Sequence, residues 1–241
     1  MAAKDQVKAL LFDVFGTVVD WRQSTIRELT AFGNARGFAV DWARFADDWR
    51  GLYQPAMDEV RSGRRGWTVL DDLHRESLLT LLERYRISGL AAHEIEHLNR
   101  IWHRLDPWPD SVEGLLRLKR RYIIGTLSNG NVGLLLRMAK RALLPWDVIL
   151  GAEPARAYKP MPECYLRNAA FLNLEPSEVM LVAAHNGDLA AAASTGYRTA
   201  FVVRPLEHGP GQTKDVSAER DWDVVTDSFT GLADAMGCPR R

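Results

Sequence analysis

Strand and helix signals alternate through the second half of the chain, and this alternation constrains the fold more than any other feature. Apolar segments of strand length lie at residues 122–127, 148–150, 179–184 and 198–203, and a shorter one begins at Val224. Segments with helical periodicity flank them, at residues 111–121, 132–142, 163–172 and, in an Ala-rich stretch, up to Thr195. Strands that alternate with helices form parallel sheets with right-handed crossovers. We therefore predict an α/β fold with a doubly wound, Rossmann-like parallel sheet.

One further strand lies near the start of the chain. The apolar run Ala9–Phe12 ends at Asp13, and Gly16 with Thr17 follows as a turn signal. A carboxylate at the carboxyl end of a buried strand occupies the place where open α/β sheets carry reactive groups. Asp13 is therefore the first candidate for a chemical role, and the alternative is a strand that simply ends at a solvated Asp.

Between Trp21 and Leu105 the chain has helical periodicity and hardly any strand signal. The periodicity predicts helices at residues 24–36, 42–61, 69–84 and 91–105. Two prolines in the segment 106–110 then break the pattern. We predict a catalytic core of residues 1–20 and 106–241, interrupted after its first strand by an all-helical cap domain of residues 21–105.

Composition narrows the class of protein. The 241 residues are 46% hydrophobic, which is enough to fill a core. The 31 basic and 31 acidic residues balance, so neither a nucleic acid nor a membrane surface is expected as a partner. Cys164 and Cys238 are too few for a disulfide framework, and no apolar run has the length of a membrane span or the pattern of a signal peptide. These features predict a cytoplasmic protein.

Polar side chains stand at the ends of the predicted strands or in the loops beside them. They are Asp13, Ser128, Asn129, Lys159, His185 and Asp188. The carboxyl ends of parallel strands share one edge of a sheet, so these separated segments are expected to converge on one crevice. A carboxylate nucleophile, hydroxyl and amide donors, an ammonium and a second carboxylate together form a plausible site for covalent catalysis.

Four of these segments resemble, in order and spacing, the four motifs of the haloacid dehalogenase superfamily. They are Asp13-Val14-Phe15-Gly16-Thr17, Leu127-Ser128-Asn129-Gly130, Tyr158-Lys159-Pro160 and Asn186-Gly187-Asp188. Each motif is weak alone, whereas the four in order are specific, and the resemblance covers nearly the whole chain. It implies a hydrolase with an α/β core and, in many members, a helical cap.

The superfamily consists mostly of magnesium-dependent phosphatases, and two positions argue against that activity. Phosphatases carry a second Asp two residues after the nucleophile, where this chain has Phe15, which can neither donate a proton nor ligate a metal through its side chain. They also carry a further acid near the last motif, where Asp188 is followed by Leu189, Ala190, Ala191 and Ala192. Because Mg²⁺ requires several oxygen ligands, we expect no metal and no cofactor.

The aromatic residue two positions after the nucleophile, Phe15, instead resembles the first motif of the L-2-haloacid dehalogenases, the type II branch of the superfamily. That branch also has a Trp-Arg pair in the cap whose Arg binds the halide, and Trp49 with Arg50 matches it. Tyr165, six residues after Lys159, matches a family position near the substrate. Trp67, after the break at Gly66, is a candidate pocket residue, with packing in the cap as the alternative.

The resemblance implies a role for each matching residue. Asp13 attacks C2 of a 2-haloacid and forms an aspartyl ester, and Asp188 activates the water that hydrolyses it. The remaining residues position the reactants. Arg50 and Asn129 bind the departing halide, Ser128 and the N–H groups of Val14 and Phe15 hold the substrate carboxylate, and Thr17 and Lys159 stabilise the nucleophile.

The last motif departs from the pattern of the family. Counting back from Asp188, Ala183 and Ala184 stand where the family has two serines, and His185 stands where it has Asn. Our hypothesis is that His185 holds or deprotonates the hydrolytic water, against the alternative that it only caps the loop. An expected aromatic residue is also replaced near Gly187, which favours small substrates such as haloacetates.

A second motif, His93-Glu94-Ile95-Glu96-His97, fits the H-E-x-x-H pattern of zinc proteases. A zinc site needs a third ligand and burial, and the apolar stripe of this helix lies to one side of both histidines. We expect them to face water.

These observations predict a metal-independent dehalogenase that converts short-chain L-2-haloacids to 2-hydroxyacids, with a small haloacid as its partner. A magnesium-dependent phosphatase is the alternative activity, and a catalytically silent protein that binds a small carboxylate is the alternative from another class. Members of the family often form homodimers, but the sequence itself indicates no interface.

Overall fold

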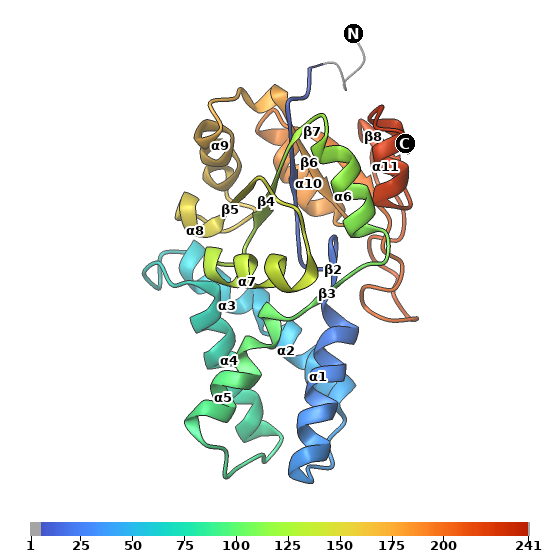
Figure 1. Cartoon of the computed structure of the whole chain (residues 1–241). Helices are drawn as coiled ribbons and strands as arrows, with labels where there is room; N and C mark the ends of the chain where they lie inside the picture. Colours follow the sequence, from blue (N-terminus) through green and yellow to red (C-terminus); the bar gives the residue numbers. More distant parts are fainter. Residues whose placement is uncertain (1–5, 241) are drawn as a thin grey trace.

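The core of the protein is a parallel sheet. The computed structural model describes residues 6–240 and places six strands in the order β5-β4-β1-β6-β7-β8 (Figure 1). Their bounds are β1 Ala9–Phe12, β4 Ile123–Ser128, β5 Val148–Gly151, β6 Val179–Ala183, β7 Arg198–Val202 and β8 Val224–Thr226. All neighbours pair in parallel, and β1 lies between β4 and β6. The predicted doubly wound α/β sheet is confirmed.

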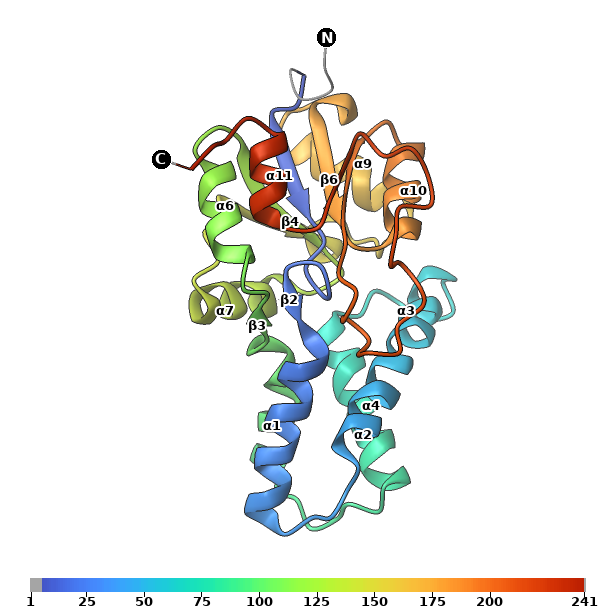
Figure 2. The same ribbon diagram turned by 90° about the vertical axis from the view of Figure 1, so that its right-hand side faces the viewer.

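Alternate residues of β1 explain how helices come to cover both faces of the sheet. Leu10 and Phe12 pack into one hydrophobic cluster, and Ala9 and Leu11 into the other. Helices α6 and α11 cover the first face, and α9 and α10 the second (Figure 2). The helices of the core are α6 Ser111–Lys119, α7 Val132–Ala142, α8 Ala152–Ala155, α9 Pro162–Phe171, α10 Asn186–Ser194 and α11 Phe229–Ala235.

A helical insertion follows β1 and forms the lower half of the molecule in Figure 1. It contains α1 Trp21–Arg36, α2 Trp42–Gly51, α3 Tyr53–Arg61, α4 Leu70–Arg84, α5 Ala92–Asn99 and a 3₁₀ turn at Arg100–His103. The single helix predicted at 42–61 was wrong, because the chain breaks at Leu52. Pro55 explains the break, since a proline cannot donate to the carbonyl of Gly51 and its ring would clash with that carbonyl.

The chain enters and leaves the insertion through a pair of two-residue strands that the sequence did not predict. Strand β2 (Val19–Asp20) pairs antiparallel with β3 (Asp106–Pro107), and Asp20 lies opposite Asp106. Asp20 also caps α1, because its Oδ1 accepts a 2.9 Å hydrogen bond from the N–H of Gln23. The two segments that connect the insertion to the sheet domain therefore lie side by side.

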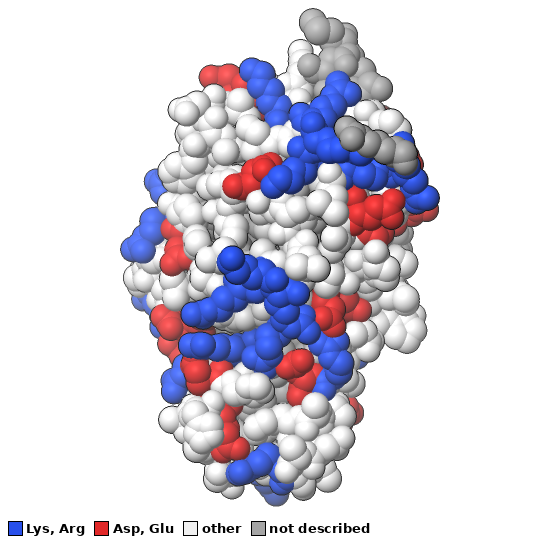
Figure 3. Space-filling model, in the orientation of Figure 1, with Lys and Arg blue, Asp and Glu red and all other residues white. Residues whose placement is uncertain are grey.

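Charged side chains of both signs are mixed on the surface, and basic ones gather in bands at the level of α7 (Figure 3). Asp106 in β3 pairs with basic side chains of both the sheet domain and the insertion. Its carboxylate pairs with Arg141 of α7 at 2.7 Å and with Arg27 of α1. No helix within the described residues is both long and apolar enough to cross a membrane.

Candidate active site

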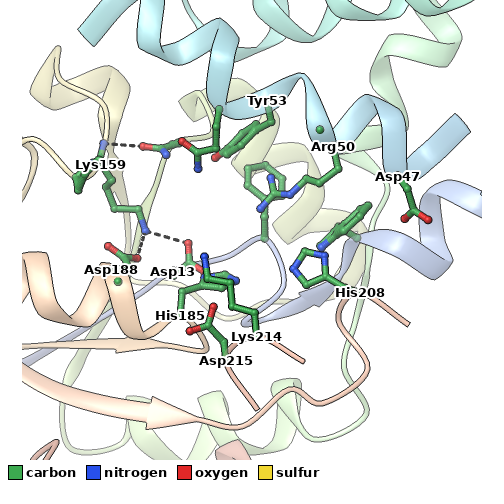
Figure 4. A pocket seen from close by; sticks show the side chains of 17 residues that line it. Asp13, Asp47, Arg50, Tyr53, Lys159, His185, Asp188, His208, Lys214 and Asp215 are labelled. Atoms are coloured by element: carbon green, nitrogen blue, oxygen red, sulfur yellow. Dashed lines mark hydrogen bonds and ion pairs between the residues drawn. The ribbon is translucent and has the colours of Figure 1, made fainter. Parts of the chain in front are cut away.

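Segments that are far apart in the sequence meet beyond the carboxyl ends of the strands, as predicted. Asp13 follows β1, Ser128 ends β4, and His185 follows β6. Lys159 lies in the loop between α8 and α9, and Asp188 lies in the first turn of α10. A cavity of about 690 Å³ opens above them, with walls from both the sheet domain and the helical insertion (Figure 4).

The turn after β1 fixes the carboxylate of Asp13. The N–H of Asp13 donates to the carbonyl of Val182 at 3.0 Å, which continues the sheet to this residue. Gly16 then adopts a φ of 90°, a conformation open to glycine, and the chain turns back. This turn brings Thr17 beside Asp13, and its Oγ1 donates a 2.6 Å hydrogen bond to Oδ2 of Asp13. The nucleophile candidate is therefore buried yet borders the cavity.

Lys159 connects the two carboxylates of the site. Its Nζ lies 2.9 Å from Oδ1 of Asp13 and also donates to Oδ2 of Asp188. The other oxygen of Asp188 accepts a 2.6 Å hydrogen bond from the hydroxyl of Tyr165. Tyr165 is buried on α9 and reaches the site only through Asp188. Both oxygens of Asp188 are thus occupied.

The electrostatics of the site keep Asp13 ionised. Burial alone would raise the pKa of its carboxyl, but the charges of Lys159 and His185 and the hydrogen bond from Thr17 outweigh burial. The pKa of Asp13 is therefore held far below its usual range. The same carboxylates raise the pKa of Lys159 above its ordinary value although burial lowers it. A charged ammonium between two carboxylates results.

His185 lies between two acids rather than capping the loop with its side chain. Its Nδ1 is 3.1 Å from Oδ2 of Asp13, and its Nε2 is 2.9 Å from Oε2 of Glu207. Burial alone would lower the pKa of His185, but Glu207 and Asp13 raise it well above its ordinary value. In the resting protein this histidine is a cation.

Arg50 faces the cavity from the last turn of α2, on the cap side of Figure 4. Its guanidinium carbon lies 4.1 Å from the ring centre of Tyr53 and 5.4 Å from that of Trp21. Within residues 6–240, Arg50 has no ion pair, and its Nη1 is buried without a hydrogen-bond partner. An unpaired, desolvated cation that borders a cavity is a site for an anion.

Two polar residues follow the end of β4. Oδ1 of Asn129 accepts a 2.8 Å hydrogen bond from the N–H of Lys159, which leaves the Nδ2 side of the amide toward the cavity. Ser128 is fully buried and does not line the cavity, and its Oγ accepts a 3.2 Å hydrogen bond from the N–H of Gly130.

The first motif supplies an apolar wall. The ring of Phe15 lines the cavity and meets Trp102 edge-on at 5.9 Å. The side chain of Val14 is buried away from it, and its carbonyl accepts hydrogen bonds from Val18 and Val19 at 3.0 and 3.2 Å. Phe15 thus packs and lines the pocket at once.

Trp67, predicted as a pocket residue, does not line the cavity. Its ring stacks on Tyr158 with centres 4.9 Å apart, and Arg156 covers it at 5.1 Å. The hydroxyl of Tyr158 donates to the carbonyl of Thr68 at 2.8 Å, which draws this segment toward the loop before Lys159. Trp67 therefore packs the insertion against that loop.

The H-E-x-x-H segment lies outside the site. His93 and His97 are exposed, and Glu94 accepts a 2.8 Å hydrogen bond from the N–H of Ala91 and pairs with Arg36. Glu94 therefore caps α5. Among residues 6–240, no three His, Cys, Asp or Glu side chains are arranged to hold a metal ion.

Several cavity residues were missed by the sequence analysis. They are Trp21, Asp47, Gln54, His208, Lys214 and Asp215, together with Glu207, which contacts His185. Most lie in the loop between β7 and β8, which runs down beside the insertion in Figure 2. This loop of residues 203–223 contains no motif, and only folding brings it to the site.

The fold, the cap and the strand-end residues define a class of hydrolase. A model of the haloacid dehalogenase-like hydrolase family matches residues 7–196. The chain belongs to this family, as its four motifs indicated.

Several relatives are more specific. The (S)-2-haloacid dehalogenase 4A of Burkholderia cepacia is 28% identical over 238 residues, which cover 95% of this chain and 99% of the relative. The crystal structure of the defluorinating L-2-haloacid dehalogenase Rha0230 is 51% identical, with a TM-score of 0.94 over 96% of this chain and 95% of its own. The L-2-haloacid dehalogenase PA0810, also known from a crystal structure, is 45% identical to this chain. Its TM-score is 0.93, over 96% of this chain and 99% of its own. The resemblance to L-2-haloacid dehalogenases is confirmed.

Proposed function

We propose that this protein hydrolyses short-chain L-2-haloacids to 2-hydroxyacids through an ester on Asp13. The observation that supports this most is that one cavity is lined both by an ionised, buried Asp13 and by Arg50, whose Nη1 has no hydrogen-bond partner among the described residues. Displacement of halide from carbon requires a nucleophilic carboxylate and a cationic site that binds the departing halide.

In the first step, an oxygen of Asp13 forms a bond to C2 of the haloacid while the carbon–halogen bond breaks. The halide leaves with the bonding electrons, and the configuration at C2 inverts. Arg50 and the Nδ2 of Asn129 donate to the halide where its charge develops. Thr17 and Lys159 hold the nucleophile in place.

The substrate carboxylate needs donors of its own. We assign it to the N–H groups of Val14 and Phe15, which follow the nucleophile, with Ser128 supporting the adjacent turn through Gly130. Phe15 forms the apolar wall, and Trp67 has no role in binding substrate.

In the second step, water attacks the acyl carbon of the ester and releases the 2-hydroxyacid. The family resemblance assigns activation of this water to Asp188. Both oxygens of Asp188 already accept hydrogen bonds, from Lys159 and Tyr165. We therefore propose that Asp188 holds Lys159 in place and does not activate the water.

A magnesium-dependent phosphatase is less well supported. The side chain of Phe15 supplies no oxygen, and the ammonium of Lys159 lies between Asp13 and Asp188 where a cation would need their oxygens. The residues present do not fit Mg²⁺, and no step of the proposed reaction uses a metal.

Halide release from chloroacetate and L-2-chloropropionate, with and without EDTA, tests the proposal. We expect equal release in both conditions, and none from Asp13→Asn, which should keep its fold. Phosphate release with Mg²⁺ in place of halide release would favour the phosphatase. Binding of haloacids without turnover would indicate a silent protein.

The halide range follows from the relatives. Because the 51% identical Rha0230 is defluorinating, we include fluoroacetate among the proposed substrates, to be tested by fluoride release in the same assay. A cytoplasmic location, a homodimer and a cap domain of residues 21–105 also belong to this proposal. Cell fractionation, sedimentation velocity and limited proteolysis test them in turn.

A further inference from the structure

His185 faces two carboxylates, one on each ring nitrogen. Nδ1 lies 3.1 Å from Asp13, the proposed nucleophile, and Nε2 lies 2.9 Å from Glu207. Its side chain is 23% exposed and borders the cavity. The ring thus presents one nitrogen to the reacting carboxyl and the other to a fixed acid. This is the arrangement by which a buried acid orients a histidine base.

Glu207 is held rigidly although it lies in the loop between β7 and β8. It is 1% exposed, and its Oε1 accepts a 3.1 Å hydrogen bond from Nε1 of Trp21, the first residue of α1. It also lies against the turn after the nucleophile, because a Cβ on Gly16 would come within 2.1 Å of its Oε1. His208 Nε2 approaches the same oxygen at 3.5 Å. These contacts leave Oε2 directed at His185.

We propose that Glu207 is the positioning residue that makes His185 the base for hydrolysis of the Asp13 ester. This inference rests on the proposed function and deepens it, because it assigns the second chemical step. Asp188, whose two oxygens are engaged by Lys159 and Tyr165, is not available for that task.

Water adds to the acyl carbon of the Asp13 ester, and Nδ1 of His185 takes its proton while Glu207 accepts the hydrogen bond from Nε2. The tetrahedral intermediate expels the alkoxide of the 2-hydroxyacid, which recovers the proton from Nδ1. The carboxylic acid left on Asp13 then gives its proton to His185. This restores the ion pair that the resting structure contains.

The next turnover releases that proton. Burial lowers the pKa of His185, and Glu207 and Asp13 together raise it. Esterification removes the charge of Asp13, one of the two acids that raise the pKa of His185, so that pKa falls. The proposed step requires His185 to give its proton to solvent at this stage, so that Nδ1 is free to accept a proton from water. One proton per halide is also what the overall hydrolysis requires.

Single-turnover experiments on Glu207→Gln test the inference. With enzyme in excess over L-2-chloropropionate, we expect release of halide within about tenfold of the wild-type rate and ester hydrolysis slowed about 100-fold. Intact-protein mass spectrometry would then detect the ester on Asp13. Glu219→Gln makes the same charge change in an exposed residue of the same loop and should leave both steps unchanged.

Two further measurements separate positioning from mere support of the fold. His185→Asn should slow the same step, and the double variant with Glu207→Gln should be no slower than His185→Asn alone. The pH at which ester hydrolysis reaches half its maximum should shift to lower values in Glu207→Gln, because the remaining acid that raises the pKa of His185 is gone. Additive losses, or an unchanged pH profile with unchanged hydrolysis, would overturn the inference.

The proposed function fails in a different way. If the wild-type protein releases no halide from any haloacid, the dehalogenase proposal is wrong. If it releases halide and Glu207→Gln hydrolyses the ester at the full rate, only the role of Glu207 is wrong.

Discussion

The hydroxyl of Thr17 donates a 2.6 Å hydrogen bond to Oδ2 of Asp13 and accepts one of 2.9 Å from the N–H of Ala184. Thr17 therefore ties the nucleophile, at the end of β1, to the end of the neighbouring strand β6. Because Thr17 is fully buried, water cannot replace either bond.

Replacement of Thr17 by Val should slow formation of the ester by about 10- to 100-fold. A hydrogen bond to a charged group contributes about 1.5–3 kcal/mol, and the N–H of Ala184 also loses its partner. Rapid-quench measurement of halide release checks the rate. Thr17→Ser keeps the hydroxyl and should retain most of the activity. Equal rates for Val and Ser would contradict the role of the hydrogen bond.

Replacement of Arg50 by Gln should lower kcat by about 100- to 1,000-fold, because the halide then leaves without a cation to receive it. Steady-state kinetics with chloride and bromide substrates measure the loss. Arg44→Gln removes the same charge from an exposed position of the same helix and should have no effect. A loss of the same size in both variants would mean that only overall charge matters.

The stability of the protein should fall as the pH rises above neutrality, through His185. Its pKa is raised above the ordinary value of 6.5 in the folded state. The stabilisation is therefore complete below pH 6.5 and is lost as the pH rises through the folded-state pKa, with a slope of at most about 1.4 kcal/mol per pH unit. Denaturant unfolding at a series of pH values measures this slope. His185→Gln should lack it, and an identical slope in the variant would assign it elsewhere.

Replacement of Gly16 by Ala should destabilise the protein and abolish activity. The φ of 90° disfavours any side chain, and the added Cβ would collide with Glu207. We expect a loss of about 3 kcal/mol or more in the free energy of unfolding, measured by denaturant titration.

The double variant Gly16→Ala with Glu207→Ala separates the two causes. Glu207→Ala alone loses the contacts of this carboxylate with Trp21 and His185, so it is the reference for the double variant. Without the carboxylate the collision is relieved, and Gly16→Ala should then cost only the roughly 1–2 kcal/mol of the backbone conformation. An equal cost of Gly16→Ala with and without Glu207 would show that the collision has little weight.

The parts of the site that lie at strand ends could be predicted from the sequence. Asp13, Ser128 and His185 directly follow or end apolar runs, and in a parallel sheet the topology alone brings such positions together. Lys159 and Asp188 were predicted as site residues from their positions in the third and fourth motifs of the family.

Glu207 could not be found in this way. It lies in a long loop with no strand end or motif beside it, and its contact with His185 depends on the path of that loop. Trp67 was misplaced for a related reason, because helical periodicity does not say which neighbour a ring at a helix start will meet. The break of the helix at Leu52 could have been predicted from Pro55. Strands β2 and β3 could not, because two residues are too few to show the alternation of a strand.

The pairing of Asp20 with Asp106 has a consequence for how such a molecule can change. The polypeptide leaves the sheet domain and returns to it at adjacent positions of one small ladder, so the intervening segment is grafted onto the core much as a long hairpin loop would be. Its length and internal architecture can vary without altering the register of any strand in the sheet. The reactive carboxylate and its partners from the strand ends are thereby separable from the part that supplies Arg50, and exchange of this segment between relatives becomes a route to new substrate ranges on an unchanged chemical framework.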